Sequence, residues 1–293
     1  MVPAAVHQYV LEILQAAAGT AITSIRFSAV GGGSINDTYQ VVTNSGNRFF
    51  VKINSAVDYP SLFVFEQQGL EALAAARLIR TPGVIATGVA GSYQVLVLEW
   101  IEQGLKSTDF WESFGRQLAA LHGTSQEGFG FDSNNYMGAL PQYNEPMANW
   151  CNFFIQRRLE PQLKLALDKQ LLASGQVRLF EGLYKILPSI FPVQVPGLLH
   201  GDLWSGNFLC DDNQQPVLID PAVYYGYPAV DMAMTTLFGG FDQAFYDSYF
   251  YYAPPAPNYR EQWEVCNLYP LLIHLNLFGK GYLPDILRTI ERY

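Results

Sequence analysis

The chain has 293 residues, enough for one large domain or for two smaller lobes. Hydrophobic residues make up 49% of it and charged residues 15%, which indicates a well-filled core and argues against long disordered stretches. Seventeen Lys and Arg against 26 Asp and Glu give a formal net charge of −9, and there is no run of basic residues, so neither a nucleic acid nor a membrane surface is an expected partner.

The N-terminal segment and the three cysteines favour a protein of a reducing compartment. Residues 1–15 carry no Lys or Arg ahead of an apolar block, which is typical of a helix rather than a signal peptide. Nowhere do apolar residues approach the run of ~18 that spans a bilayer. Cys151, Cys210 and Cys266 show no paired spacing, as expected of buried thiols rather than of disulfides or a zinc site. We therefore expect a cytoplasmic protein, and the sequence leaves open whether it is a monomer or a weak homodimer.

The first part of the chain predicts a small sheet with two helices. Apolar residues at helical spacing predict helices over residues 4–17 and 61–76. Strands are expected where apolar residues alternate or form short runs, at residues 22–30, 38–43, 48–54, 83–89 and 93–100.

A glycine-rich turn, formed by Gly31, Gly32, Gly33 and Ser34, separates the first two of these strands. The backbone N–H groups of such a turn can approach phosphates without obstruction by side chains. However, Asn36 stands where the pattern G-x-G-x-x-G would have its third glycine, and a tight hairpin needs glycines as well. Taken alone, the turn leaves both interpretations open.

Lys52 lies in a predicted strand that is otherwise apolar. Because a lysine is costly to desolvate, we expect it to pair with nucleotide phosphates; a solvent-facing strand lysine is the alternative. A site of this kind needs a helix glutamate to hold the lysine, and Glu66 is the first candidate, with Glu71 in reserve and a solvated surface acid as the ordinary alternative.

The last predicted strand runs into Glu99-Trp100-Ile101-Glu102. By its position between the sheet and the helices that follow, this segment is expected to be a hinge, where the backbone of Glu99 and Ile101 could bind adenine. We therefore predict an N-terminal lobe over residues 1–101 and a C-terminal lobe over residues 102–293.

The second part of the chain is mainly helical. Residues 124–146, rich in Gly, Asn, Ser and Pro, form a long connection that could border an acceptor site. The helices are expected at residues 109–121, 150–159, 162–172, 176–187, 231–238, 261–278 and 283–292.

The most informative stretch is residues 198–221. Asn207 comes five residues after Asp202, and Asp220 comes thirteen residues after Asn207, at the end of an apolar run. In phosphoryl-transfer enzymes an Asp, an Asn and a second Asp in this order handle the acceptor hydroxyl and hold Mg²⁺. We therefore predict Asp202 as the catalytic base and Asn207 and Asp220 as metal ligands; a polar turn between two strands is the alternative.

The histidines and Asp231 are interpreted as supporting residues. His200 opens the catalytic stretch, and Asp231 could cap the helix that it starts or brace the backbone of the catalytic loop. His122 is expected at a helix end and His274 in the core.

Residues 200–207, which read His-Gly-Asp-Leu-Trp-Ser-Gly-Asn, resemble the signature of the fructosamine-3-kinase (ketosamine kinase) family. Residues 220–226 and 237–241 are similar to the next blocks of that family. Related kinases of aminoglycosides, choline or homoserine share the His-Gly-Asp and a later Asp, but the Trp-Ser-Gly insert and the Phe-Gly-Gly-Phe block point to this family. The likeness runs from the glycine-rich turn to near the C-terminus.

The resemblance implies an α+β, protein-kinase-like bilobal fold, with a small N-terminal antiparallel sheet lobe, a larger and mainly helical C-terminal lobe, and ATP between them. It implies Mg²⁺-dependent transfer of the γ-phosphate to O3 of a fructosamine or ribulosamine, free or protein-bound, in the repair of glycated amines. Trp204, Tyr224 and Tyr225 would lie near the sugar. Two positions depart from the family pattern, since many relatives have a cysteine in place of Ser34 and often a glutamate in place of Ala229.

Two other functions stay open from the sequence. One is a kinase of another small hydroxylated amine, such as an aminoglycoside or choline. The other is a catalytically inactive nucleotide-binding homologue, although the joint presence of Lys52, Asp202, Asn207 and Asp220 argues against it.

Overall fold

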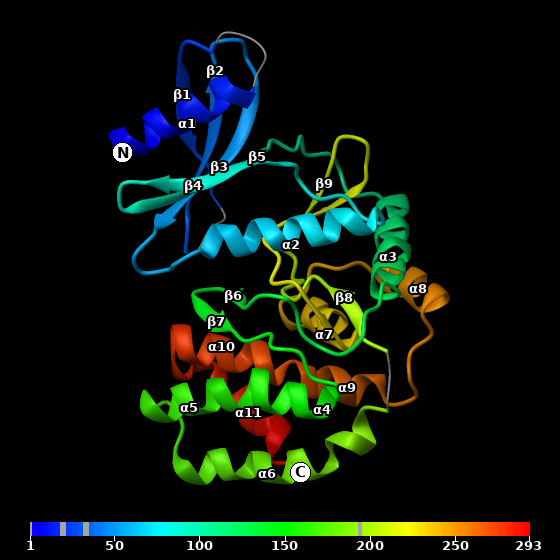
Figure 1. Cartoon of the computed structure of the whole chain (residues 1–293). Coiled ribbons are helices and arrows are strands. Elements are labelled where there is room, and N and C mark those ends of the chain that lie inside the picture. The colour runs from blue at the N-terminus through cyan, green and yellow to red at the C-terminus, as the bar shows by residue number, and fades with distance from the viewer. Residues whose placement is uncertain (1, 18–21, 32–34, 193–194) are drawn as a thin grey trace.

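The computed structural model describes residues 2–17, 22–31, 35–192 and 195–293. The chain forms two lobes, a small one built around a sheet and a larger one built mainly of helices (Figure 1). This confirms the predicted α+β class and bilobal arrangement. The division after residue 101 stays a prediction.

The small lobe holds one five-stranded sheet, in the order β1-β2-β3-β5-β4, in which every neighbouring pair is antiparallel. One helix packs on each face, because alternate residues of the central strands point to opposite sides. Val95 and Val97 pack with the α1 residues, whereas Leu96 and Leu98 pack with those of α2. The elements are α1 (Ala4–Ala17), β1 (Ile25–Ala29), β2 (Asp37–Thr43), β3 (Arg48–Ser55), α2 (Leu62–Ala76), β4 (Val84–Ala90) and β5 (Tyr93–Glu99).

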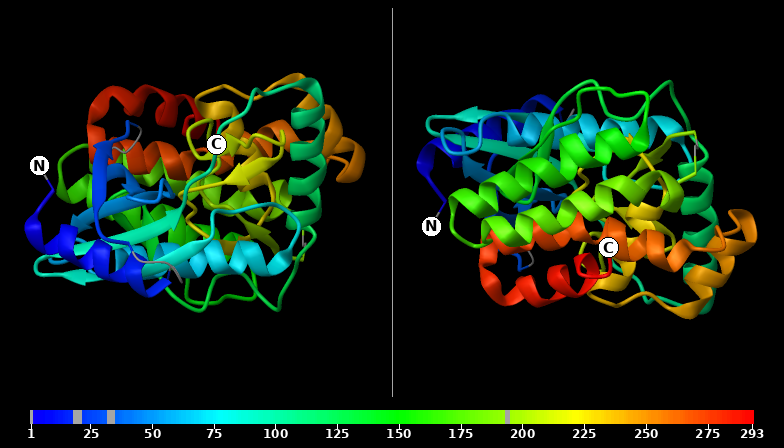
Figure 2. Two further views of the ribbon diagram at one scale, coloured as in Figure 1. Left: turned by 90° about the horizontal axis from the view of Figure 1, so that it is seen from above. Right: turned by 90° about the horizontal axis from the view of Figure 1, so that it is seen from below.

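The large lobe is a set of helices around two apolar clusters. Seen from below, the segment from α4 to α6 and the helices α10 and α11 lie side by side across the underside (Figure 2). The helices are α3 (Thr108–His122), α4 (Trp150–Phe153), the π-helix η1 (Phe154–Leu159), α5 (Glu160–Asp168), α6 (Ser174–Ile190), α7 (Ala229–Leu237), α8 (Gln243–Tyr252), α9 (Tyr259–Cys266), α10 (Leu268–Phe278), the 3₁₀-helix η2 (Lys280–Tyr282) and α11 (Leu283–Ile290).

Short strands between the helices carry the predicted catalytic stretch. β8 (Gly197–Leu199) pairs with β11 (Tyr224–Gly226), and β9 (Phe208–Cys210) pairs with β10 (Pro216–Leu218). Residues 200–207 therefore form the loop from β8 to β9, and residues 219–223 form the loop from β10 to β11. A third pair, β6 (Asn135–Met137) with β7 (Leu140–Gln142), lies inside the predicted long connection.

Two helix predictions were wrong in part, the first in the type of helix and the second in its continuity. The helix expected over residues 150–159 changes from α4 to a π-helix at Phe154, where the buried Arg158 must be placed among aromatic rings. The helix expected over residues 261–278 is divided at Asn267, whose Nδ2 donates to the carbonyl of Ala233 at 3.0 Å.

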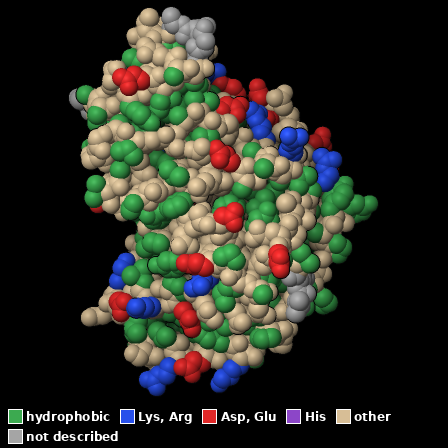
Figure 3. Space-filling model, in the orientation of Figure 1, with side chains coloured by type: hydrophobic (Ala, Val, Ile, Leu, Met, Phe, Trp, Pro, Cys, Tyr) green, Lys and Arg blue, Asp and Glu red, His purple; other side chains and the backbone are tan. Residues whose placement is uncertain are grey.

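Charged side chains are sparse on the face of the molecule drawn in Figure 3, as expected from their 15% share of the sequence. On this face, acidic and basic side chains are interspersed rather than gathered by sign (Figure 3). Among the described residues, none of the helices combines the length and apolarity that a bilayer crossing requires.

Candidate active site

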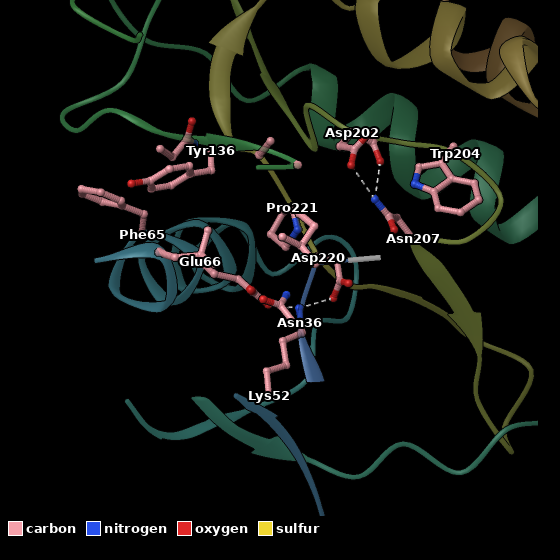
Figure 4. A pocket seen from close by; sticks show the side chains of 15 residues that line it. Asn36, Lys52, Phe65, Glu66, Tyr136, Asp202, Trp204, Asn207, Asp220 and Pro221 are labelled. Carbon is pink, nitrogen blue, oxygen red and sulfur yellow. Dashed lines mark hydrogen bonds and ion pairs between the residues drawn. The ribbon is translucent and has the colours of Figure 1, made fainter. Parts of the chain in front are cut away.

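The predicted catalytic residues meet on the walls of one cavity of about 130 Å³, to which both lobes contribute (Figure 4). Lys52 and Glu66 reach it from the small lobe, and Asp202, Asn207 and Asp220 from the loops of the large lobe. We call this cavity the transfer pocket. The residues that line it are Ile35, Asn36, Lys52, Leu62, Phe65, Glu66, Asn135, Tyr136, Gly138, Asp202, Trp204, Asn207, Asp220, Pro221 and Ala222.

Lys52 reaches the pocket because of its register in β3. It stands opposite Leu96, which packs on the α2 side of the sheet, so the lysine points to α2 as well. Its Nζ donates to Glu66 Oε1 and to Asp220 Oδ1, both at 2.6 Å, and only 2% of the side chain is exposed. Burial alone lowers the pKa of Lys52, but the carboxylates of Asp220 and Glu66 outweigh it and raise the pKa above its usual value. The ammonium is therefore permanently charged.

Glu66, and not Glu71, is the partner of Lys52. The Glu66 carboxylate is nearly enclosed, and burial raises its pKa although the charge of Lys52 opposes the rise. Glu71 lies at the exposed surface of α2, where it accepts a hydrogen bond from Gln67 at 2.7 Å.

Asp202 and Asn207 form a bonded pair. Asn207 Nδ2 donates to Asp202 Oδ2 and to the Asp202 carbonyl, both at 2.9 Å. Burial raises the pKa of Asp202 to about 7, against the opposite effect of the bond from Asn207. Because the amide nitrogen is engaged, the Asn207 oxygen is left to other ligands; within the described residues it has no hydrogen-bond partner.

Asp220 is held in an unusual backbone conformation. Its φ of 54° lies in the left-handed region, which residues other than glycine seldom adopt. The residues around it are tied to the catalytic stretch, since the Ile219 N–H donates to the Asn207 carbonyl at 3.1 Å and the Ala222 N–H to the His200 carbonyl at 2.9 Å. His200 Nε2 also bonds the Ile219 carbonyl at 2.9 Å, which places His200 as a support of this loop. Strain of this kind tends to occur at functional sites.

Asp231 braces the backbone of the catalytic loop. Its buried carboxylate accepts hydrogen bonds from the N–H groups of His200 at 2.7 Å and Gly201 at 2.8 Å, and contacts His122 Nε2 at 3.1 Å. Burial opposes ionisation, but the bond from His122 and the other polar neighbours outweigh it and lower the pKa of Asp231. Of the two predicted roles, these contacts favour the brace.

Gly201 is needed for the same turn. Its φ is +84°, and a Cβ there would lie 2.0 Å from the Ala222 carbonyl oxygen. His122 is indeed at a helix end, but its link to the catalytic loop through Asp231 could not be read from a single histidine in the sequence.

A second cavity, of about 180 Å³, lies beside the predicted hinge; we call it the hinge pocket. It shares Asn36 and Asp220 with the transfer pocket. Both Glu99 and Ile101 line it. The Glu99 N–H is already bonded to the Gly83 carbonyl at 2.8 Å, and the Glu99 side chain to Arg80. Within the described residues the N–H of Ile101 has no such partner, so this group can bind a ligand.

Phe50, Leu98, Leu209 and Ile219 give the hinge pocket apolar walls suited to a flat aromatic ring. Gly31 lines it too. Gly32, Gly33 and Ser34, which were predicted to bind phosphate, lie outside the described residues.

The structure separates the three aromatic residues predicted to contact the sugar. Trp204 lines the transfer pocket. Tyr224 does not: it is 1% exposed, with its ring 5.7 Å from that of Phe153 and 4.0 Å from the guanidinium of Arg158. A side chain so enclosed cannot contact a sugar, so this prediction was wrong. Tyr225 points to the opposite face of the strand, half-buried near Asp132, and does not line the pocket either.

One asparagine of the small lobe, Asn36, was missed as a site residue. Asn36 lines both pockets, and its Oδ1 accepts a hydrogen bond from Asn54 Nδ2 at 2.7 Å. The available signal was the position of Asn54, two residues after Lys52 and therefore on the same face of β3. Asn135, Tyr136 and Gly138 line the transfer pocket from the connection that was expected to border an acceptor site.

Comparison with known proteins gives one consistent answer. The sequence model of a family described as fructosamine kinase matches residues 6–293. A probable ketoamine kinase of Synechocystis sp. is 42% identical over 257 residues, which cover 87% of this chain and 85% of that protein. A chloroplastic protein-ribulosamine 3-kinase of Arabidopsis thaliana is 38% identical over 293 residues, covering 96% and 86% respectively.

A solved structure also matches almost the whole chain. A crystal structure assigned as a fructosamine-3-kinase from Thermobifida fusca superposes with a TM-score of 0.86 at 31% identity, and the match covers 96% of this chain and 97% of that one. The predicted fold is confirmed by this match.

Proposed function

Because the chain belongs to the fructosamine kinase family, we propose that it is a ketosamine 3-kinase, which uses ATP and Mg²⁺ to phosphorylate O3 of the sugar in fructosamines or ribulosamines. The observation that carries the proposal is the convergence on one pocket of the five side chains that phosphoryl transfer needs: Lys52, Glu66, Asp202, Asn207 and Asp220.

The donor atoms of the transfer pocket fit magnesium. Asn207 offers an amide oxygen and Asp220 a carboxylate, both hard ligands of the kind that Mg²⁺ prefers. No group of three or more His, Cys, Asp or Glu that could hold a metal occurs in the described part of the chain. Phosphate oxygens and water would therefore complete the coordination, as is usual for Mg²⁺ bound with a nucleotide. When bound, the ion supplies positive charge that stabilises the transferring phosphoryl group.

The chain's own residues divide the remaining work. Lys52 would bind the α- and β-phosphates, and Glu66 keeps its ammonium in place when a metal competes for Asp220. Asp202 would orient the O3 hydroxyl and accept its proton as the oxygen bonds to the γ-phosphorus and the bond to ADP breaks. A carboxylate with a raised pKa is suited to holding that proton. The adenine ring would lie in the hinge pocket, against the free N–H of Ile101.

A panel of acceptors with Mg·ATP tests the proposal. We expect phosphorylation of ribulosamine or fructosamine adducts, with the phosphate on O3 by NMR and the product mass raised accordingly, and none of aminoglycosides or choline. The Asp220→Ala variant is the blank, since it lacks a metal ligand. Phosphorylation of aminoglycosides or choline alone would favour the rival kinase function, and nucleotide binding without turnover on any acceptor would favour an inactive homologue.

The cellular role follows from the chemistry. A 3-phosphorylated ketosamine is unstable, so the enzyme would serve to remove sugar adducts from amines of small molecules or of proteins. We propose that it does so in the cytoplasm, as a monomer or weak homodimer.

A further inference from the structure

A third cavity, of about 340 Å³, adjoins the transfer pocket on the side of Trp204. The two cavities share Ile35, Gly138, Asp202 and Trp204. A ketosamine whose O3 lies at Asp202 extends from C3 in two directions, towards the amine at C1 and towards the hydroxyl-bearing carbons beyond C3. The second direction is polar, so the amine and its substituent are the part that suits this third cavity, and we call it the substituent pocket.

The walls of the substituent pocket are mainly apolar. Met137, Met234, Phe238, Ile273 and Leu277 are among the residues that line it. Of its described lining residues, Asp202 is the single acid, and there is no Lys or Arg. An apolar substituent would gain about 25 cal/mol for each Å² of surface removed from water. A carboxylate would instead lose its hydration without a cation to pair with, and would face the charge of Asp202.

His274 places a hydrogen-bond acceptor in the substituent pocket. Its Nδ1 lies 2.7 Å from the Pro270 carbonyl oxygen, which can only accept, so Nδ1 carries the hydrogen. Burial lowers the pKa of His274 although the Pro270 carbonyl opposes this, so the imidazole is neutral. Nε2 is then a hydrogen-bond acceptor, and among the described residues it has no partner.

The ring of His274 is also fixed in orientation. Its centroid lies 5.1 Å from that of Phe238, 5.5 Å from that of Phe278 and 5.0 Å from that of Tyr282. Nε2 of His274 is therefore a neutral hydrogen-bond acceptor in a fixed position. It suits a hydrogen-bond donor of the bound substrate, such as a sugar hydroxyl or the secondary ammonium of the ketosamine.

We propose, on the basis of the ketosamine kinase function, that the substituent pocket selects ketosamines whose amine carries an uncharged, apolar group over those with a carboxylate beside the amine, and that His274 Nε2 accepts a hydrogen bond from the acceptor. The side chain of a lysine within a peptide meets this requirement, because its amine is joined to a chain of methylene groups. A ketosamine of a free α-amino acid does not.

The wild-type protein tests the selection without any substitution. We would measure kcat/KM for the ribulosyl and fructosyl adducts of leucine, leucinamide and leucinol, which share one side chain and differ in the carboxyl group. We expect the two uncharged adducts to exceed the leucine adduct by about tenfold or more, as for a charge that is left unpaired in an apolar site. Equal values, or a preference for leucine, would overturn the selection. If no adduct is phosphorylated, the ketosamine kinase function itself fails.

Substitution of His274 tests the hydrogen bond. In His274→Phe we expect the KM for the leucinamide adduct to rise about fivefold, since an ordinary hydrogen bond is lost, with the KM for ATP unchanged. His274→Gln, which keeps an acceptor oxygen, should recover part of the loss. An unchanged KM for the leucinamide adduct in both variants would overturn the role of His274. If His274→Phe does not fold, the test rests on His274→Gln, provided that this variant shows a cooperative thermal unfolding transition.

Discussion

Three residues of the transfer pocket depart from the ordinary behaviour of their type. Lys52 is almost fully buried yet charged, Asp202 has a raised pKa, and Asp220 has a left-handed backbone. The raised pKa of Asp202 and the left-handed backbone of Asp220 each cost folding free energy, because a desolvated carboxylate or a strained dihedral is less stable than its relaxed form, whereas the charge of Lys52 is compensated by Asp220 and Glu66. The occurrence of the three departures together in one cavity marks that cavity as the functional site.

The raised pKa of Asp202 predicts a stability effect with a definite sign. The carboxyl has a pKa of about 7 in the folded protein and an ordinary value of 3.8, so the folded state binds more protons between these values. Its contribution to stability is therefore present near pH 4 and is lost as the pH rises through about 7. Asp202→Asn, which stays neutral, should raise the thermal unfolding midpoint of the metal-free protein at pH 8 by more than at pH 5.

The measurement is a pair of calorimetric scans in EDTA for each protein. Asp212→Asn, in the exposed turn between β9 and β10, is the matched control. Its unfolding midpoint should differ from that of the wild type by the same small amount at pH 5 and at pH 8. A gain from Asp202→Asn that is as large at pH 5 as at pH 8 would contradict the raised pKa.

At the scale of elements, the catalytic loop is held by helices that lie outside the pocket. Asp231 on α7 connects the loop after β8 to His122 at the end of α3, and His122 Nδ1 bonds the hydroxyl of Tyr249 on α8 at 2.7 Å. The backbone of the loop is therefore fixed from outside by Asp231, in addition to the contacts of the loop's own His200 and Asn207 side chains. This is the support that a preorganised active site needs.

Removal of this brace should unfold the protein more readily. In Asp231→Ala two buried N–H groups and His122 lose their partner, and we expect a loss of about 3–5 kcal/mol in the free energy of unfolding. Urea titration followed by fluorescence would measure it. Asp242→Ala removes an exposed aspartate that caps α8 through the Ala244 N–H, and should cost about 1 kcal/mol. Similar losses in the two variants would show that Asp231 is not a brace.

The predicted elements were reliable where the hydrophobic period was regular. The continuous apolar run of β5 indicates a strand buried on both faces, the apolar spacing of α1 indicates a helix buried on one face, and both elements form where they were expected. Tyr224 and Tyr225 show the limit of such reasoning. Alternation places them on opposite faces of β11, but only the packing of Phe153 and Arg158 decides that Tyr224 belongs to the core.

At the scale of the molecule, the lobes are linked by an arginine beside the hinge. Arg80 of the small lobe bonds Glu99 at the end of β5 and Asp211 of the large lobe, both at 2.5 Å. The Leu218 N–H also donates to the Arg80 carbonyl at 2.9 Å. Since Glu99 lines the hinge pocket, the link fixes the wall where the adenine ring would bind.

Loss of this link should weaken nucleotide binding moderately. The side chains of Arg80 and Glu99 are 37% and 40% exposed, so solvent screens this pair and only about 0.2–1 kcal/mol is at stake for it, whereas the buried Asp211, at 2% exposure, loses its partner. For Arg80→Gln we expect the Kd for Mg·ATP, measured by calorimetry, to rise about threefold. Arg292→Gln breaks an exposed pair with Glu264 on α9 and should leave the Kd unchanged. An unchanged Kd in Arg80→Gln would show that the link does not shape the hinge pocket.

The sequence by itself determined the chemical inventory and its order along the chain: a strand lysine, a helix glutamate, and the sequence Asp202, Asn207, Asp220, together with the periodic patterns that place them in two lobes. Such information is local, because a spacing of a few residues is enough to define it. What only the tertiary structure decided is which side chains meet. Residues 168 apart in the chain, such as Lys52 and Asp220, come within 2.6 Å only when the lobes pack. The enclosure of Tyr224, the brace from Asp231 and the apolar pocket around His274 depend in the same way on contacts between distant segments, which no local pattern encodes.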